Sequence, residues 1–223
     1  MEYANIVEKS DFYEFAGHDN LKLKTIPFPH SIKQKEFNYI HDYIVEHKLT
    51  KGFECATGTG ISTLAAALAM KATGGKLVTM DAFSEETFVS YNLATPFVIN
   101  KTSTGQKALS QLIDIFQLEN HVASEVGWSP TDTLSSLGKH FDLSKDKLDF
   151  VFIDACHMDE AIKKDVAELK PYLSKTCAMF FHDLEIGGGI TTHFKDWLQE
   201  QFGKTYNIIV PQPNGFNLGL LQL

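Results

Sequence analysis

The sequence predicts an α/β fold in which a doubly wound, mostly parallel sheet ends in an antiparallel hairpin. A glycine-rich turn at residues 57–60 joins a short apolar run to an alanine-rich segment, which indicates a strand, a tight turn and a helix. Further strand-like runs alternate with segments whose apolar residues recur at helical spacing. The last two strand-like runs, 206–210 and 216–223, are joined by 211–215, which is too short for a crossover helix and requires an antiparallel pair.

Size and composition predict one globular domain spanning 1–223. The chain has 223 residues, of which 43% are hydrophobic, enough for a full core. The formal charge of −8 opposes the broad basic surface of a nucleic-acid-binding protein, so we expect no nucleic-acid partner. No apolar run approaches the roughly 20 residues that span a bilayer, and the N-terminus lacks a secretion signal. We therefore expect no membrane partner and a cytoplasmic location.

The first elements follow from local signals. Residues 1–30 show little periodicity but are rich in aromatic residues, and they either pack on the sheet edge or form a cover over the site. Ser31 and Gln34 have the form of a capping box that opens a helix reaching to about residue 48. A strand at 51–55 and a helix at 62–73 flank the glycine turn, and a second strand at 76–81 ends in an acid.

The middle of the chain contains an insertion at 84–105, longer than the usual connection between elements. We expect a substrate lid or an oligomer contact there, and we favour the lid. A helix with an apolar face around Ala108 and Leu112 follows, and then a strand at 122–126. Ser129 is predicted to cap the next helix, with Pro130 at its first position.

Two neighbouring predicted strands, 148–153 and 176–181, each end in titratable residues. Ligands on open parallel sheets bind beyond the carboxyl ends of the strands, and these ends meet at one edge. We therefore expect the following side chains to share a site: Asp154, His157, His182 and Asp183.

The flanks of the glycine turn indicate its ligand. Glu54 lies just before the turn, and Thr63 stands three residues after Gly60. A turn that binds pyrophosphate has a third small residue at that position and no use for a nearby carboxylate. An acid suits a cationic or hydroxyl-bearing ligand better.

This acid-x-small-x-Gly-x-Gly pattern, continued by Ile61-Ser62-Thr63, resembles the first motif of class I S-adenosylmethionine-dependent methyltransferases, and of small-molecule O-methyltransferases in particular. The family usually has glycine where this chain has Ala56. The resemblance covers about residues 31–223. It implies a Rossmann-like sheet of seven strands in the order 3-2-1-4-5-7-6, with the turn running under the methionine part of the cofactor.

The resemblance also implies roles along the strand ends. Asp81, about twenty residues after the turn, would accept hydrogen bonds from ribose hydroxyls. Trp128 would stack on the adenine and Ser129 would bond its edge, although a tryptophan packed in the core is equally open. The predicted cofactor-binding residues are Glu54, Ala56, Thr57, Gly58, Gly60, Ser62, Thr63, Asp81, Ala82, Phe83, Trp128, Ser129 and Asp154.

Methyl transfer to a hydroxyl needs in-line placement of the reactants and removal of the hydroxyl proton. We predict His157 as the base with His182 as the other candidate, and Asp154 completes the catalytic set. Some related O-methyltransferases bind Mg²⁺ with acids at these strand ends, which implies Asp154 and Asp183 as ligands here. Because Asp183 is preceded by His182 and followed by Leu184 rather than by an acid or amide, a site without metal stays open.

The leading hypothesis is a methyltransferase that uses S-adenosyl-L-methionine to methylate a small-molecule acceptor, such as a hydroxyl of a sugar or secondary metabolite. A nicotinamide-dependent oxidoreductase is the alternative from another class, although the flanks of the turn argue against a pyrophosphate site. A protein that binds the cofactor without turnover is the third hypothesis. A homo-oligomer is also compatible with the sequence.

Overall fold

The computed structural model describes residues 1–17, 19–25, 31–82, 87–88, 97–98, 101–156, 158–184, 192–212 and 217–223. Its centre is a seven-stranded sheet in the order β10-β11-β9-β8-β3-β4-β7. Renumbered along the chain and read from β7, this is the predicted order 3-2-1-4-5-7-6. The strands are β3 (Lys51–Cys55), β4 (Lys76–Asp81), β7 (Val122–Val126), β8 (Leu148–Ile153), β9 (Leu173–Leu184), β10 (Asn207–Val210) and β11 (Asn217–Gln222).

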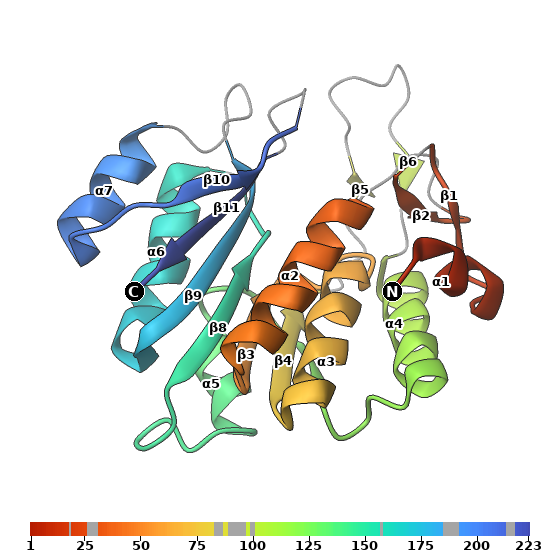
Figure 1. Cartoon of the computed structure of the whole chain (residues 1–223), viewed down its shortest axis with the longest axis horizontal. Helices are drawn as coiled ribbons and strands as arrows, with labels where there is room; N and C mark the ends of the chain where they lie inside the picture. Colours follow the sequence, from red (N-terminus) through yellow and green to blue (C-terminus); the bar gives the residue numbers. More distant parts are fainter. Residues whose placement is uncertain are drawn as a thin grey trace.

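Strand directions also match the prediction. The strands β3, β4, β7, β8 and β9 run parallel to one another, whereas β11 is antiparallel to both β9 and β10. Parallel neighbours place their carboxyl ends at one edge of the sheet, which is the upper edge in Figure 1. The strand ends that carry the predicted site residues are therefore gathered along that edge.

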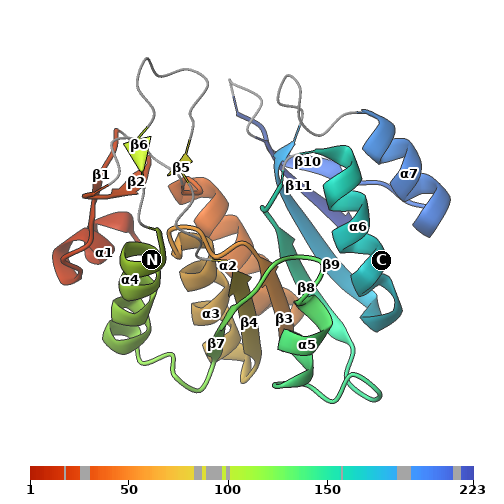
Figure 2. The same ribbon diagram turned by 180° about the vertical axis from the view of Figure 1, so that it is seen from behind.

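Helices cover both faces of the sheet, so the fold is doubly wound as predicted (Figures 1 and 2). Successive side chains of β8 point to opposite faces of the sheet and so pack into two different hydrophobic cores, one on each face. Phe150 and Phe152 pack with α2 and α3, whereas Val151 and Ile153 pack with α5, α6 and α7. The helices are α2 (Gln34–His47), α3 (Ile61–Thr73), α4 (Lys101–Phe116), α5 (Thr133–Gly138), α6 (Asp159–Leu169) and α7 (Thr192–Phe202).

The N-terminal segment has structure that sequence periodicity did not predict. It forms α1 (Tyr3–Lys9) and an antiparallel hairpin of β1 (Tyr13–Phe15) and β2 (Leu21–Leu23). Its buried residues belong to the same core as α2, α3 and α4. A second antiparallel pair lies within the predicted insertion, formed by β5 (Thr87–Phe88) and β6 (Phe97–Val98).

Three predicted helix starts are wrong. The helix predicted to open at Ser31 begins at Gln34, because the Lys33 amide donates to Glu36 Oε2 at 2.7 Å and Ser31 Oγ donates to the Leu21 carbonyl instead. The helix predicted to be capped by Ser129 begins at Thr133, with Asp132 as its N-cap. The helix predicted to follow the insertion at 84–105 begins inside it, at Lys101 of α4.

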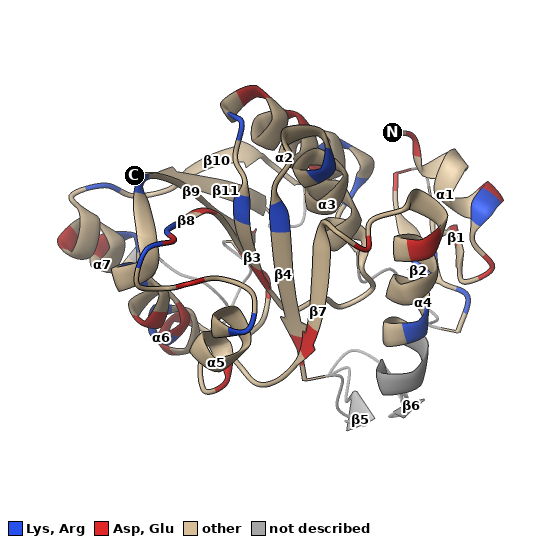
Figure 3. Ribbon diagram, turned by 90° about the horizontal axis from the view of Figure 1, so that it is seen from below, with Lys and Arg blue, Asp and Glu red and all other residues tan. Residues whose placement is uncertain are grey.

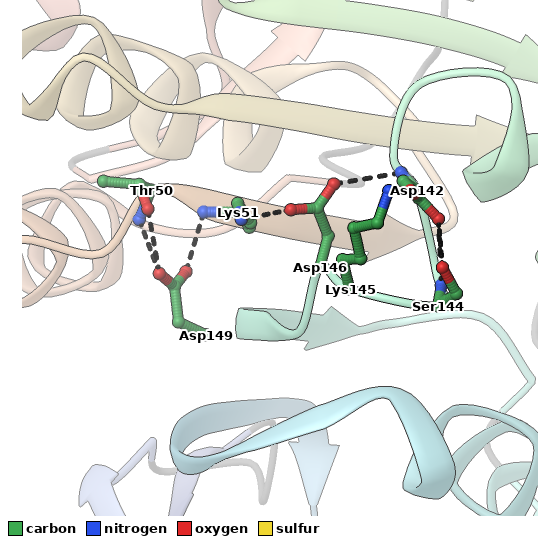
Figure 4. Close-up of polar contacts among 7 residues, drawn as sticks. All are labelled: Thr50, Lys51, Asp142, Ser144, Lys145, Asp146 and Asp149. Atoms are coloured by element: carbon green, nitrogen blue, oxygen red, sulfur yellow. Dashed lines mark hydrogen bonds and ion pairs between the residues drawn. The ribbon is translucent and has the colours of Figure 1, made fainter.

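A carboxylate holds β3 to β8 at the amino-terminal edge of the sheet (Figure 4). The Asp149 oxygens accept hydrogen bonds at 2.8 Å from the backbone amides of Thr50 and Lys51. The Lys51 ammonium group pairs with Asp146. This edge is thus fixed by structural polar contacts, opposite to the edge where the strand ends converge.

Charged residues occur mainly on the outer helices and at strand ends, and blue and red are mixed in the view of Figure 3. The chain has 20 basic and 28 acidic residues. Among the described helices, none has the length and apolar character needed to cross a membrane.

Candidate functional site

The glycine turn between β3 and α3 is left-handed at three positions. Its φ angles are +76° at Ala56, +54° at Gly58 and +80° at Gly60. Glycine reaches such angles freely, whereas an L-residue loses roughly 1–2 kcal/mol there. The Ala56 amide donates to the Met80 carbonyl at 2.9 Å, which ties the turn to β4. Ala56 therefore occupies the conformation that the usual glycine would adopt, at some cost in stability.

Glu54 lies beneath this turn and is 1% exposed. Its Oε1 accepts the Ser62 hydroxyl at 2.5 Å, and its Oε2 accepts the hydroxyls of Thr63 at 2.5 Å and Thr79 at 2.6 Å. Burial raises the pKa of this carboxyl to about 7, although the three hydroxyl donors work in the opposite direction. Glu54 thus links the turn, the start of α3 and β4 through one buried hydrogen-bond network.

The accessible part of the turn is small. Thr57, Ser62 and Thr63 are buried, whereas Gly58 is exposed and Ala56 is partly exposed. The buried hydroxyls hold the turn from below, because Thr57 Oγ1 lies 2.7 Å from Thr79 Oγ1 and the others bond Glu54. A ligand at this turn would meet mainly backbone.

Asp81 lies beside the turn at the end of β4. Its Oδ2 accepts a hydrogen bond from the Gly58 amide at 2.9 Å. Asp81 and the following Ala82 are partly buried, and Phe83 lies outside the described residues. The structure therefore brings the predicted ribose-binding carboxylate and the glycine turn together.

The N-terminal hairpin supports the turn from behind. The Tyr13 hydroxyl donates to the Thr59 carbonyl, and Tyr13 is fully buried. A Cβ atom added to Gly60 would lie 3.3 Å from Leu109 of α4 and 3.6 Å from the Tyr13 hydroxyl. Sequence reasoning did not identify Tyr13, since the segment lacks the periodicity that would have placed it.

The segment after β7 carries Trp128 and Ser129. Trp128 is 53% exposed, which excludes the alternative of a core tryptophan. The Trp128 amide donates to Oδ2 of Asp132, the N-cap residue of α5, at 2.9 Å. Ser129 Oγ donates to the carboxylate of Asp165 on α6. The adenine-binding roles of Trp128 and Ser129 stay predictions.

Asp154, His182 and Asp183 come together at the ends of β8 and β9. His182 Nδ1 lies 3.0 Å from Asp183 Oδ1 and 3.4 Å from Asp154 Oδ1. One ligand atom from each of these side chains lies within 4.8 Å of the others. The predicted juxtaposition of the two strand ends is thus present, while His157 lies outside the described residues.

Glu36, from the first turn of α2, is a member of this cluster that sequence reasoning missed. Its Oε1 lies 3.3 Å from His182 Nε2, and its side chain is 1% exposed. Figure 1 shows why this contact forms, because α2 begins at the edge where β8 and β9 end. The sequence indicates only that an acid two residues after Gln34 can bond the first amides of a helix, and it does not indicate the contact with His182.

The electrostatics of His182 are dominated by these carboxylates. Burial disfavours a charged imidazole, but Asp154, Asp183 and Glu36 outweigh burial and raise the His182 pKa well above its usual range. A negative cluster of this kind holds a cation, either a proton on the imidazole or an ion between the acids.

Comparisons with known proteins agree with the fold. A family model described as a methyltransferase domain matches residues 53–184, more than half of the chain. No curated protein matches the sequence.

Three solved structures illustrate the structural likeness. The O-methyltransferase from Bacillus cereus in complex with SAH is 14% identical, with a TM-score of 0.62 over 86% of this chain and 81% of that one. The O-methyltransferase TomG from Streptomyces achromogenes, in complex with SAM, is 14% identical, with a TM-score of 0.60 over 87% and 81%. The SAH-bound methyltransferase PaMTH1 from Podospora anserina is 12% identical, with a TM-score of 0.58 over 86% and 80%.

Proposed function

This chain belongs to the methyltransferase-domain family, and from that premise we propose that it transfers a methyl group from S-adenosylmethionine to a hydroxyl of a small-molecule acceptor. The cofactor supplies an electrophilic methyl carbon on a sulfonium. The observation that carries the proposal is the meeting of the glycine turn with Asp81, where Asp81 Oδ2 accepts the Gly58 amide at 2.9 Å. A carboxylate beside an accessible backbone suits a ligand with ribose hydroxyls.

Individual residues have distinct roles in this proposal. The backbone at Ala56 and Gly58 lines the methionine side of the cofactor, and Asp81 accepts ribose hydroxyls. Glu54 acts from below by fixing the turn, which its three hydroxyl partners and its burial support. Trp128 offers its exposed ring to the adenine.

The acid cluster serves the acceptor side. Asp154 and Asp183 have the oxygen donors that suit a divalent cation, and buried His182 faces both with Nδ1. A cation held there would lower the pKa of an acceptor hydroxyl. We propose that His157, three residues after Asp154, accepts the hydroxyl proton, since His182 is 8% exposed and enclosed by carboxylates.

The acceptor is proposed to be a hydroxyl of a sugar or secondary metabolite. Two O-methyltransferases share the fold, and one of them, TomG, is involved in tomaymycin synthesis. The family match disfavours the nicotinamide-dependent oxidoreductase. The lid role of residues 84–105 and the cover role of residues 1–30 stay proposals.

Calorimetric titration tests the cofactor. We expect micromolar binding of S-adenosylmethionine and of its demethylated product, and no heat from NAD or NADP. Asp81→Asn should weaken binding by about tenfold, because a neutral amide accepts ribose hydroxyls less well than a carboxylate. Asp42→Asn on α2 is the matched control, since the Asp42 side chain is exposed and its carboxylate contacts the neighbouring His41.

Binding of a dinucleotide without binding of S-adenosylmethionine would overturn the proposal. Turnover is then measured as release of the demethylated cofactor with panels of sugar and secondary-metabolite hydroxyls. Tight cofactor binding without turnover on any panel would favour the cofactor-binding protein instead.

A further inference from the structure

His182 is an unusual member of the acid cluster because it is buried and its ring nitrogens lack well-formed hydrogen bonds. It is 8% exposed, and neither Nδ1 nor Nε2 makes a hydrogen bond of good geometry among the described residues. Yet Nδ1 lies 3.0 Å from Asp183 Oδ1 and 3.4 Å from Asp154 Oδ1. The His182 nitrogens therefore lie close to carboxylate oxygens without the geometry of a hydrogen bond.

Such spacing is typical of neighbouring ligands of one cation. Metal–ligand bonds of about 2.1 Å at right angles place adjacent donor atoms about 3 Å apart. The distances from His182 Nδ1 to the two carboxylates fall near this value. The geometry therefore fits one ion that shares an imidazole nitrogen with two carboxylate oxygens.

Glu36 lies on the other side of the imidazole ring. Its Oε1 is 3.3 Å from His182 Nε2, while its Oε2 is anchored by the Lys33 amide at 2.7 Å. At this distance the negative charge of the Glu36 carboxylate favours the proton on the nearer ring nitrogen, Nε2, and so favours one orientation of the ring. With the proton on Nε2, the Nδ1 lone pair faces Asp154 and Asp183.

We propose that Glu36 is a positioning residue that aims His182 Nδ1 at the space between Asp154 and Asp183, so that the three side chains select Mn²⁺ or Co²⁺ over Mg²⁺. Imidazole nitrogen suits transition cations, whereas an all-oxygen set suits Mg²⁺. The proposal deepens the proposed function, on which it rests for the role of the cation beside the acceptor. Cation binding itself is measured without cofactor.

The experiment begins with the full chain stripped by a chelator. We expect calorimetry to show one site for Mn²⁺ and Co²⁺, with Mg²⁺ binding at least tenfold more weakly. Pulsed electron paramagnetic resonance of the Mn²⁺-loaded protein should show modulation from a coordinated ¹⁴N nucleus.

His182→Asn replaces the imidazole nitrogen by an amide group whose oxygen can take its place. It should abolish the ¹⁴N modulation and narrow the preference for Co²⁺ over Mg²⁺ by about tenfold, since the donor set becomes all oxygen. If the variant does not fold, the modulation in the wild-type protein still decides the question.

Glu36→Gln tests the positioning role. It should weaken Mn²⁺ binding about tenfold and reduce the ¹⁴N modulation, because the carboxylate that orients the ring is lost. Glu46→Gln is the matched control, since Glu46 is exposed on the same helix and loses the same charge. Melting curves of both variants separate a positioning effect from loss of folding.

Two results would overturn the inference: no binding of any of the three cations, or Mn²⁺ binding without ¹⁴N modulation. The first would mean that the carboxylates hold a proton on His182 instead of a metal ion. S-adenosylmethionine is titrated separately, so that cofactor binding without cation binding refutes this inference alone. Cation binding without cofactor binding refutes the proposed function.

Discussion

The buried Glu54 carboxyl beneath the glycine turn makes the stability of the fold depend on pH. Burial raises its pKa from 4.5 to about 7 in the folded chain. Between these values the folded state binds more protons than the unfolded state, so stability falls as pH rises through that window. A shift of this size corresponds to about 3–4 kcal/mol at most, since one pKa unit is worth about 1.4 kcal/mol.

We therefore expect Glu54→Gln to flatten the fall in stability between about pH 4.5 and 8. The measurement is the free energy of unfolding from urea titrations across that range, for the wild type and the variant. Glu46→Gln, an exposed change on α2, should keep the wild-type slope. Equal pH slopes for wild type and Glu54→Gln would show that Glu54 has an ordinary pKa.

At the residue scale, the sequence predicts where acids end strands but not what they contact. Asp81, Asp154 and Asp183 were found because strand ends can be located from apolar runs. Glu36 was not, since its contact with His182 depends on how α2 crosses the sheet. The burial of Glu54 was also unpredicted, because the hydroxyls that satisfy it come from α3 and β4.

At the scale of elements, the hairpin β1–β2 supports the glycine turn. Tyr13 reaches the Thr59 carbonyl from the hairpin, while Tyr3 of α1 donates to the Ile32 carbonyl at 2.5 Å. Both tyrosines are buried and bond a backbone carbonyl, but only one of these carbonyls belongs to the turn. Comparing Tyr13 with Tyr3 therefore separates support of the glycine turn from a general contribution to stability.

We expect Tyr13→Phe and Tyr3→Phe each to lower the free energy of unfolding by about 1 kcal/mol, through loss of a buried hydrogen bond. Only Tyr13→Phe should also weaken S-adenosylmethionine binding, by about fivefold, because the turn loses its support. Urea unfolding and calorimetry on both variants provide the two readouts. Equal affinities for the two variants would refute a role of the hairpin in the site.

Element types were predictable where periodicity is strong, as in β8 and α3, and boundaries were not. The start of α2 moved from Ser31 to Gln34 because Glu36 rather than Gln34 bonds the N-cap amide. The helix α5 starts after Ser129 because the serine hydroxyl bonds Asp165 of α6. In both cases the hydroxyl of the predicted cap serine bonds a residue outside the helix, the Leu21 carbonyl for Ser31 and Asp165 for Ser129.

At the scale of the whole molecule, the two cores are joined through one sheet. Residues of β8 alternate between them, so that neither core can lose its packing without disturbing the strand that also serves the other. The N-terminal segment adds buried residues to one of the two cores. The prediction of one domain spanning 1–223 therefore implies a single cooperative unit.

We expect differential scanning calorimetry to show one transition in which the calorimetric and van't Hoff enthalpies agree. Two resolved transitions would contradict a single domain. The midpoint should rise with S-adenosylmethionine concentration, since a ligand of the folded state stabilises it by mass action.

The order of the strands was predictable from the family resemblance and the C-terminal hairpin, because the short connection at 211–215 fixes the direction of the last strand. The N-terminal elements lie outside that resemblance, and their weak periodicity left them without a predicted structure.

The contact between Glu36 and His182 also constrains when the acid cluster can form during synthesis of the chain. The two residues lie most of the sequence apart, so that a ribosome must complete nearly the whole protein before the histidine can reach its acid. Until then the Glu36 carboxylate, in the first turn of α2, lacks the His182 imidazole beside it. The acid cluster is thus completed late, and a product that ended between residues 60 and 182 would contain the glycine turn without His182 and Asp183.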